Sequence, residues 1–396
     1  MRILISAGEA SGDLYASRLV EAIRTRHPDA EFFGCAGPRM QAAGVRAIVD
    51  ADSLNVVGIV EVVLHLPRIW REFRKLIASA RSERPDLAVL TDSPDFHLPL
   101  ARRLHHLCVP VAYLVAPQVW AWRSNRIREM RWNIDRLLCI FPFEEEFFLK
   151  NRIKTTYIGH PLTALLCRGQ SGFVFSRPRQ PLAEPRPEGL VHEESGFVFS
   201  RGPIVALLPG SRPGEVARHL PILIRAIAAI RRKHSITPVL ALPPGFVLSP
   251  TLRERIDAAS IQLSIGHTWD VLAQSELALA ASGTVTIEAA LLGIPMVTFY
   301  RVNALSWIVG RRLVRAPFLT MVNLVAGRQI VPELIQREMT PGRIAAEACQ
   351  LLEDSSRRAA MRAGLAEVSE HLKTGRDPME VAADDIERLW SETHRT

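Results

Sequence analysis

The sequence lacks any run of about 18 to 20 consecutive apolar residues, the length that a transmembrane helix needs. The apolar stretch near the N-terminus ends by Gly8, and the acidic Glu9 follows it. It is too short for a secretory signal peptide and predicts instead a buried first strand. We therefore expect a cytoplasmic chain without a membrane-spanning segment, and its 396 residues predict two domains.

Cysteine is also scarce, and no two cysteines form a Cys-x-x-Cys pair. Their scatter argues against a disulfide framework or a structural zinc site, and it favours a reducing compartment. The five cysteines are Cys35, Cys108, Cys139, Cys167 and Cys349. The Gly-x-Gly-x-x-Gly dinucleotide fingerprint is absent too, so we expect neither a metal nor a dinucleotide cofactor.

Charge is not balanced, since the chain carries a formal net charge of +8. A basic surface suits nucleic acid, anionic lipid or phosphorylated substrates. The sequence has no RNA- or DNA-binding signature, and its basic residues interleave with apolar ones. We therefore expect anionic lipid and phosphate as partners, and no nucleic acid.

Short apolar runs alternate with longer helical patterns in both halves of the chain, which predicts parallel sheets covered by helices on both faces. The alternation stops in a stretch rich in Pro, Gly, Ser and Arg, where the heptapeptide SGFVFSR occurs twice. We interpret the repeat as a duplication in a tolerant loop, and an aromatic lid or lipid contact as the alternative. The expected divisions are a domain over 1–167, a linker insertion over 168–202 and a domain over 203–396.

Two motifs follow expected strands of the first half. The loop Ala7–Asp13 has two glycines that permit a tight turn and close approach of a ligand, although Asp13 is equally suited to cap the next helix. The segment Thr91–Phe96 holds Asp92 and Asp95, and a carboxylate at such a strand end can accept a proton from a substrate hydroxyl. One of the two acids is expected to cap a helix, and the residue types do not say which. The spacing is not Asp-x-Asp, so no metal site is expected here.

A third segment, Pro117–Arg123, contains Trp120 and Trp122 at another expected strand end. Tryptophan there can stack on a sugar or line an acyl groove. Packing in the core is the more common role of so large a side chain.

Two strand-to-helix turns of the second half are suited to phosphate. In Leu207–Arg212, helix N-terminal N–H groups and the Arg212 guanidinium would face an anion, although a solvated Arg212 is the alternative. In Ala281–Glu288, the Gly-Thr pair can do the same, and Glu288 lies one turn into the helix, within reach of ribose hydroxyls. A capping box is the alternative, but the spacing from Thr284 to Glu288 is four residues and not three.

The segment Leu66–Arg84 predicts a basic amphipathic helix with Pro67 in its first turn. Such a helix is typical of a membrane surface, with ordinary core packing as the alternative. The residues expected to face the membrane are Leu66, Arg68, Ile69, Trp70, Arg71, Phe73, Arg74 and Lys75.

Taken together, these segments resemble the lipid-A-disaccharide synthase family over nearly the whole chain apart from the linker. The ordered set is AGEASGD, AGPRMQAAG, VGIVEV, DSPDF, PQVWAWR, IGHP, LLPGSR, SGTVTIE and NLVAGR. Any one of these motifs alone is weak evidence for the family, whereas the whole set in this order is specific to it. Two departures from the family pattern stand out: His97 follows Phe96 where Asn is expected, and Gln118 occupies a position where Ser is frequent.

The resemblance implies a GT-B glycosyltransferase with two Rossmann-like domains, acceptor side first and UDP-sugar side second, and a last helix that returns to the first domain. It implies transfer of 2,3-diacylglucosamine from UDP to 2,3-diacylglucosamine 1-phosphate. The products are the β-1,6-linked disaccharide 1-phosphate of lipid A and UDP, made with inversion and without a metal. The enzyme would lie peripherally on the cytosolic face of the inner membrane, and whether it forms a homodimer stays open.

The resemblance also implies roles for individual residues. Asp95 would be the general base, although the sequence does not decide between Asp92 and Asp95. The expected acceptor-binding residues are Glu9, Ser11, Asp13, Gln118 and Trp120. The expected UDP-sugar contacts are Gly210, Ser211, Arg212, Gly283, Thr284, Glu288 and Asn323. The alternatives are a UDP-N-acetylglucosamine 2-epimerase, another GT-B glycosyltransferase, and a non-catalytic nucleotide-sugar-binding scaffold, since one fold hosts many functions.

Overall fold

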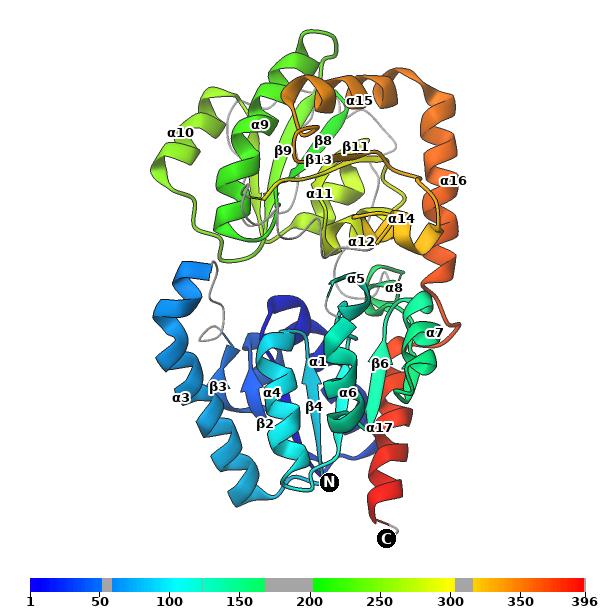
Figure 1. Cartoon of the computed structure of the whole chain (residues 1–396). Coiled ribbons are helices and arrows are strands. Elements are labelled where there is room, and N and C mark those ends of the chain that lie inside the picture. Colours follow the sequence, from blue (N-terminus) through cyan, green and yellow to red (C-terminus); the bar gives the residue numbers. More distant parts are fainter. Residues whose placement is uncertain (52–58, 123, 168–201, 303–315, 395–396) are drawn as a thin grey trace. The chain divides into compact units, whose positions relative to one another are not determined.

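The computed structural model describes residues 1–51, 59–122, 124–167, 202–302 and 316–394 (Figure 1). These residues form two compact units. The first unit holds the chain from Met1 to Ala164 together with the segment that begins at Leu372, and the second holds the described residues between Leu165 and His371. The expected linker insertion, with its duplicated heptapeptide, lies outside the described residues except for Gly202.

The first unit is built on a parallel seven-stranded sheet in the order β3-β2-β1-β4-β5-β6-β7. The chain moves outward from β1 in one direction and then from β4 in the other, so the topology switches between these two strands. Ala7 pairs with Thr91, which brings the loops that follow β1 and β4 to one edge. Ligands of open parallel sheets bind at such a switch point. The strands are β1 (Arg2–Ala7), β2 (Glu31–Ala36), β3 (Arg46–Asp50), β4 (Leu87–Thr91), β5 (Val111–Leu114), β6 (Arg136–Cys139) and β7 (Thr155–Tyr157).

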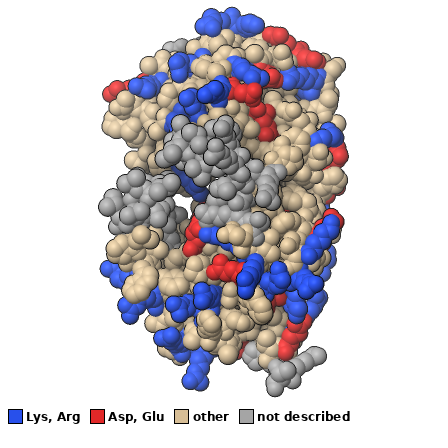
Figure 2. All heavy atoms as spheres, in the orientation of Figure 1, with Lys and Arg blue, Asp and Glu red and all other residues tan. Residues whose placement is uncertain are grey.

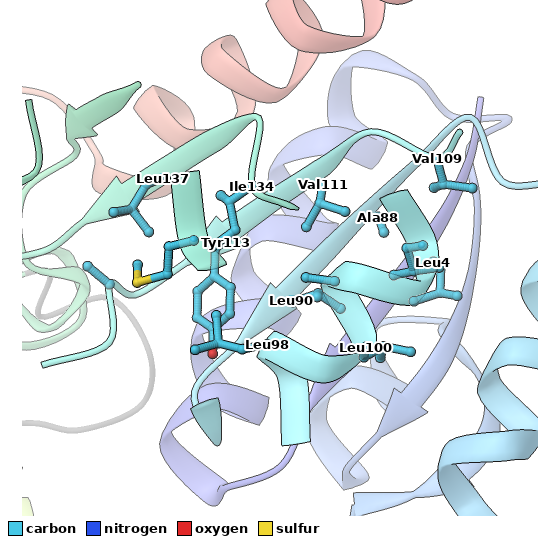
Figure 3. Close-up of a cluster of buried hydrophobic side chains, with 14 of the residues drawn as sticks. Leu4, Ala88, Leu90, Leu98, Leu100, Val109, Val111, Tyr113, Ile134 and Leu137 are labelled. Carbon is cyan, nitrogen blue, oxygen red and sulfur yellow. The ribbon is translucent and has the colours of Figure 1, made fainter. Parts of the chain in front are cut away.

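Helices cover both faces of this sheet because its central strands are buried apolar runs. On one face, β4 and β5 contribute Leu90 and Tyr113 to a core that Leu98 and Ile134 complete (Figure 3). The helices are α1 (Ala10–Arg26), α2 (Pro38–Ala42), α3 (Ile59–Glu83), α4 (Pro94–His105), α5 (Val119–Trp122), the 3-10 turn η2 (Ser124–Arg126), α6 (Ile127–Asn133), α7 (Pro142–Lys150), α8 (Pro161–Cys167) and α17 (Pro378–His394).

The C-terminal helix α17 belongs to the first unit, where it packs against α1 and β6 (Figure 1). Arg26, near the end of α1, pairs with the carboxylates of Glu380, Asp384 and Glu387. Arg136 of β6 binds both oxygens of Glu392, at 2.6 and 2.8 Å. Both bonds come from Nη2, and hydrogen bonds between charged groups are stronger than those between neutral groups.

The second unit repeats the plan with a parallel six-stranded sheet in the order β10-β9-β8-β11-β12-β13. The topology switches between β8 and β11, whose ends lie together because Leu208 pairs with Ala280. The strands are β8 (Ile204–Leu208), β9 (Thr237–Leu242), β10 (Gln262–Ile265), β11 (Leu277–Ala281), β12 (Met296–Tyr300) and β13 (Glu333–Ile335). The helices are α9 (Pro213–Arg231), α10 (Pro250–Ala258), α11 (Thr268–Gln274), α12 (Thr284–Leu291), α14 (Met321–Ala326), α15 (Pro341–Glu353) and α16 (Ser355–His371). The predicted fold class, two Rossmann-like α/β units with parallel sheets, is confirmed.

Candidate active site

The turn that follows β4 has an unusual backbone conformation. Asp92 and Ser93 both have positive φ angles, +53° and +35°, which non-glycine residues rarely adopt. The Asp92 carboxylate accepts the backbone N–H groups of Gly8 at 2.9 Å and Glu9 at 3.0 Å. Burial raises the pKa of Asp92 to about 7, and the hydrogen bond from Ser93 opposes the rise. Asp92 thus joins the two strand-end loops at the switch point.

Gly12, in the first turn of α1, shows why a glycine is needed close to the end of β1. A Cβ atom at this position would lie 1.7 Å from Oδ2 of Asp92, and 2.8 Å from its Cγ. The Asp92 carboxylate is held by Gly8 and Glu9, so it cannot move aside without breaking those bonds. The glycine therefore allows α1 to approach the buried acid.

Asp95 lies in the first turn of α4 and differs from Asp92 in its exposure and in its partners. Its side chain is 69% exposed. It forms an ion pair with the guanidinium of Arg126, which is itself mostly buried. A substrate hydroxyl can therefore reach Asp95, and Arg126 fixes the direction of its carboxylate.

Asp13 has a structural role that the sequence did not predict. Its side chain is buried, and its two oxygens accept the backbone N–H groups of Arg39 at 3.0 Å and Met40 at 3.1 Å. It therefore acts as a capping acid, but for α2 and not for α1, the helix that the sequence led us to assign to it. Both carboxylate oxygens of Asp13 are thus engaged by backbone N–H groups inside the unit. Glu9 is exposed and Ser11 is partly exposed, so both stay candidates for acceptor contact.

Trp120 packs into the first unit as the core-packing alternative describes. Its indole N–H donates to Glu144 at 3.0 Å, and its ring meets Phe143 edge-on at 5.0 Å. Burial raises the pKa of Glu144 to about 8, and the bond from Trp120 opposes the rise. Gln118 is exposed at the same strand end, which leaves it the better placed of the two for an acceptor.

The loop after β8 leads into the nineteen-residue helix α9, with Arg212 at the N-cap and Pro213 in the first turn. Gly210 has a φ of +122°, and Ser211 and Arg212 are exposed. The fully buried His219 braces this loop: its Nδ1 lies 2.6 Å from the Pro209 carbonyl oxygen. The helix N-terminus, with its N–H groups and a guanidinium beside it, is suited to a diphosphate.

The loop after β11 has the same form. Gly283 and Thr284 are exposed, with Gly283 at the N-cap of α12. Thr286 donates its hydroxyl to the Gly283 carbonyl oxygen at 2.7 Å, and no side chain caps the helix. The alternative of a capping box is therefore wrong. Burial raises the pKa of the half-buried Glu288 to about 7, against a hydrogen bond from Trp269.

Asn323 is placed differently from the expectation. It is fully buried, and its amide nitrogen donates to the Val331 carbonyl oxygen and to Glu333, at 2.9 and 2.8 Å. Its amide oxygen accepts the N–H groups of Ile330 and Val331, at 2.7 and 3.0 Å. Both hydrogen-bond donors and both lone pairs of the amide are used within the unit, which favours a structural role over the expected contact with the UDP-sugar donor.

The basic helix α3 begins at Ile59, so Pro67 lies inside it and not in its first turn. Its inner face packs into the core through Phe73, Leu76 and Ile77, which corrects the expectation that Phe73 faces a membrane.

The outer face of α3 carries two exposed apolar side chains, Leu66 and Trp70. The exposed basic side chains around them are Arg68, Arg71, Arg74 and Lys75. Ile69 is partly buried. The Arg74 guanidinium lies 4.8 Å from the Trp70 ring centroid, and basic side chains gather on this flank of the molecule (Figure 2). None of the described helices is long and apolar enough to cross a membrane.

One group of possible metal ligands occurs among the described residues. Its ligand atoms, from His234, Cys349 and Glu353, lie within 4.8 Å of one another. His234 follows the C-terminal end of α9, whereas the phosphate-suited loop precedes its N-terminal end, about 28 Å away along the helix. This group is therefore separate from the strand-end loops.

The two parallel sheets, each with a switch point, give the chain the two Rossmann-like units of a GT-B fold. Solved structures share this fold. A UDP-N-acetylglucosamine 2-epimerase from Neisseria meningitidis covers 99% of this chain and 100% of its own, with a TM-score of 0.62 at 13% identity. The kitacinnamycin glycosyltransferase covers 98% of both chains, with a TM-score of 0.60 at 15% identity. At such identities the likeness shows the fold alone.

The family follows from sequence. The family model for lipid-A-disaccharide synthetase matches residues 3–171 and 188–385. The lipid-A-disaccharide synthase of Solibacter usitatus is 54% identical over 94% of this chain and 93% of its own length. The lipid-A-disaccharide synthase of Koribacter versatilis is 43% identical over 95% of this chain and 94% of its own length. The chain belongs to the lipid-A-disaccharide synthase family, and it is a glycosyltransferase of lipid A disaccharide synthesis.

Proposed function

We propose that the chain transfers 2,3-diacylglucosamine from UDP to 2,3-diacylglucosamine 1-phosphate. The products are the β-1,6-linked disaccharide 1-phosphate and UDP. The observation that carries the proposal is the family match across both units, together with the strand-end loops to which the matching motifs belong.

Asp95 acts as the general base in this proposal. It takes the proton from the acceptor's primary hydroxyl while that oxygen forms a bond to the anomeric carbon of the donor and the bond to UDP breaks. A single displacement of this kind needs one base and no covalent intermediate, and it inverts the anomeric centre. The exposure of Asp95 and its pairing with Arg126 support this role, whereas the Asp92 side chain is only 12% exposed and is held by two backbone N–H groups.

The leaving diphosphate gathers negative charge as the bond breaks. We assign its stabilisation to the N-terminus of α9 with Gly210, Ser211 and Arg212, and to Gly283 and Thr284 at the N-terminus of α12. Donors that are already aimed at developing charge need no reorganisation during the reaction.

Glu288 holds the ribose hydroxyls of the donor. Its raised pKa of about 7 lets it accept hydrogen bonds at neutral pH in either protonation state. Glu9, Ser11 and Gln118 contact the acceptor sugar. All three are at least partly exposed, and they belong to loops at the same edge of one sheet.

The outer face of α3 brings the enzyme to the cytosolic face of the inner membrane, where both acylated substrates reside. An exposed Trp70 beside exposed arginines combines an apolar anchor with attraction to anionic headgroups. The association is peripheral.

The test is an assay in detergent micelles with both diacylated substrates, in which UDP and the lipid product are measured together. Equal amounts of UDP and disaccharide 1-phosphate are expected. Conversion of UDP-N-acetylglucosamine without an acceptor would instead identify an epimerase.

The assignment of the base is tested with matched variants. Asp95→Asn is expected to lower kcat about a hundred- to ten-thousandfold while donor affinity is retained. Glu146→Gln, which changes an exposed acid of α7 elsewhere in the unit, is the control. Near-normal turnover of Asp95→Asn with an intact fold would remove Asp95 from this role.

A further inference from the structure

We propose that His97 and Tyr113 are positioning residues of the transfer reaction, because they hold the left-handed turn at Asp92 and Ser93 from which Asp95 projects. The inference rests on the proposed role of Asp95 as base. It adds two residues that do not touch substrate, and neither has an assigned function.

Both side chains bind the same atom. The Asp92 carbonyl oxygen accepts the hydroxyl of Tyr113 and lies 3.1 Å from Nδ1 of His97. Both rings are fully buried, one from the strand β5 and one from α4. Two buried donors from different elements thus converge on one backbone carbonyl.

The geometry fixes the tautomer of His97. A carbonyl oxygen only accepts hydrogen bonds, so Nδ1 carries the proton, and Nε2 accepts the hydroxyl of Ser6 at 2.7 Å. Burial lowers the pKa of His97 to about 4, so the ring stays neutral at physiological pH. His97 therefore serves as a fixed donor, supported from β1, and not as a proton carrier.

The turn needs such support because it is strained. Two successive non-glycine residues with positive φ persist only when their surroundings hold them. The Ser93 carbonyl oxygen accepts the first helical N–H groups of α4, from Phe96 at 2.9 Å and His97 at 3.0 Å. A turn that relaxes would therefore shift the first turn of α4, which carries Asp95.

This arrangement explains why His can stand at position 97 where the family pattern has Asn. The family pattern led us to expect Asn where His97 stands, and an Asn side chain also carries an N–H donor. What the position supplies to the Asp92 carbonyl is a donor, and two residue types can supply it.

The experiment compares His97→Ala, His97→Asn and Tyr113→Phe in the full chain. His97→Ala is expected to lower kcat ten- to a hundredfold with both KM values within about twofold, and His97→Asn to recover most of the loss. Tyr113→Phe should lower kcat in the same way. Hydrogen exchange at the Phe96 amide should become faster in His97→Ala, and this readout does not depend on which residue is the base.

A suppressor variant makes the test specific. Glycine adopts positive φ without strain, so Ser93→Gly should restore kcat when added to His97→Ala, measured against Ser93→Gly alone. Cys108→Gly is the matched control, since Cys108 also has a positive φ, +58°, but lies outside the turn. It should restore nothing.

The outcomes separate the two proposals. Normal turnover of Asp95→Asn would end the role of Asp95 whatever the His97 variants do. If Asp95→Asn is inactive while folded His97→Ala keeps its kcat, the positioning role is refuted. Equal rescue by Cys108→Gly, or a loss that follows only the unfolded fraction, would refute it as well.

Discussion

Replacement of Asn323 by Ala should destabilise the second unit without weakening donor binding in the folded protein. Four hydrogen bonds are lost, and they leave two N–H groups, a carbonyl oxygen and the Glu333 carboxylate without this partner. At about 0.5 to 1.5 kcal/mol for each bond, the loss is about 2 to 6 kcal/mol. A domain has about 5 to 15 kcal/mol in total, so the effect is large.

Loss of the Asn323 side chain should also affect the loop before α14, because Glu333 binds that loop. Glu333 also accepts the N–H groups of Leu319 and Thr320, at 2.9 and 3.0 Å. The Leu319 carbonyl oxygen in turn accepts the hydroxyl of Ser282, in the loop after β11. Asn323 therefore supports the loop after β11 through Glu333 and Leu319.

The assay is urea denaturation of wild type and Asn323→Ala, with hydrogen exchange at the Ile330 and Val331 amides to report on the second unit. Gln274→Ala, which removes one amide bond to the Asp270 carbonyl oxygen, is the control and should cost about 1 kcal/mol or less. Unchanged unfolding with a raised KM for the donor would refute the reasoning and restore the expected ligand contact.

Three further outcomes follow from the same geometry. Gly12→Ala should displace the Asp92 carboxylate and speed hydrogen exchange at the Gly8 and Glu9 amides. Glu144 has a pKa raised from 4.5 to about 8, so folding favours its protonated form, and its contribution to stability falls as pH rises from about 5 to 8. Glu144→Gln should remove that slope in denaturation curves. Trp70→Glu, at a 61% exposed site, should reduce sedimentation with anionic vesicles and leave activity in detergent unchanged.

The two sheets could be predicted from the sequence because their central strands are continuous apolar runs between turn-rich segments. Two edge strands, β3 (Arg46–Asp50) and β13 (Glu333–Ile335), were not predicted. Each mixes charged with apolar residues and forms a strand because a neighbouring strand offers its edge. These segments become strands because they pair with a neighbouring strand, and their own amino-acid composition does not predict this.

The helix α3 shows a second limit. The spacing of its apolar residues predicts the helix correctly, but the residues expected to face a membrane belong to two different sides of the helix. Phe73 packs into the core while Trp70, three residues earlier, is exposed. An apolar stripe at helical spacing specifies a buried face, and the sequence alone does not say where the stripe's edge meets solvent.

For the site as well, the sequence predicts which loops take part but not what each residue in them does. Strand ends followed by glycine and acidic residues correctly marked the loops that meet at each switch point. Which side chain faces a ligand was not decided there, because Asp13 and Asn323 are polar residues in matching motifs whose partners are backbone groups of the same unit. In a sequence motif, a residue that supports the backbone of a site cannot be told from a residue that contacts the ligand. Burial separates them: fully used hydrogen bonds inside the unit identify the first kind, and exposure at the strand end, as at Asp95 and Arg212, identifies candidates for the second.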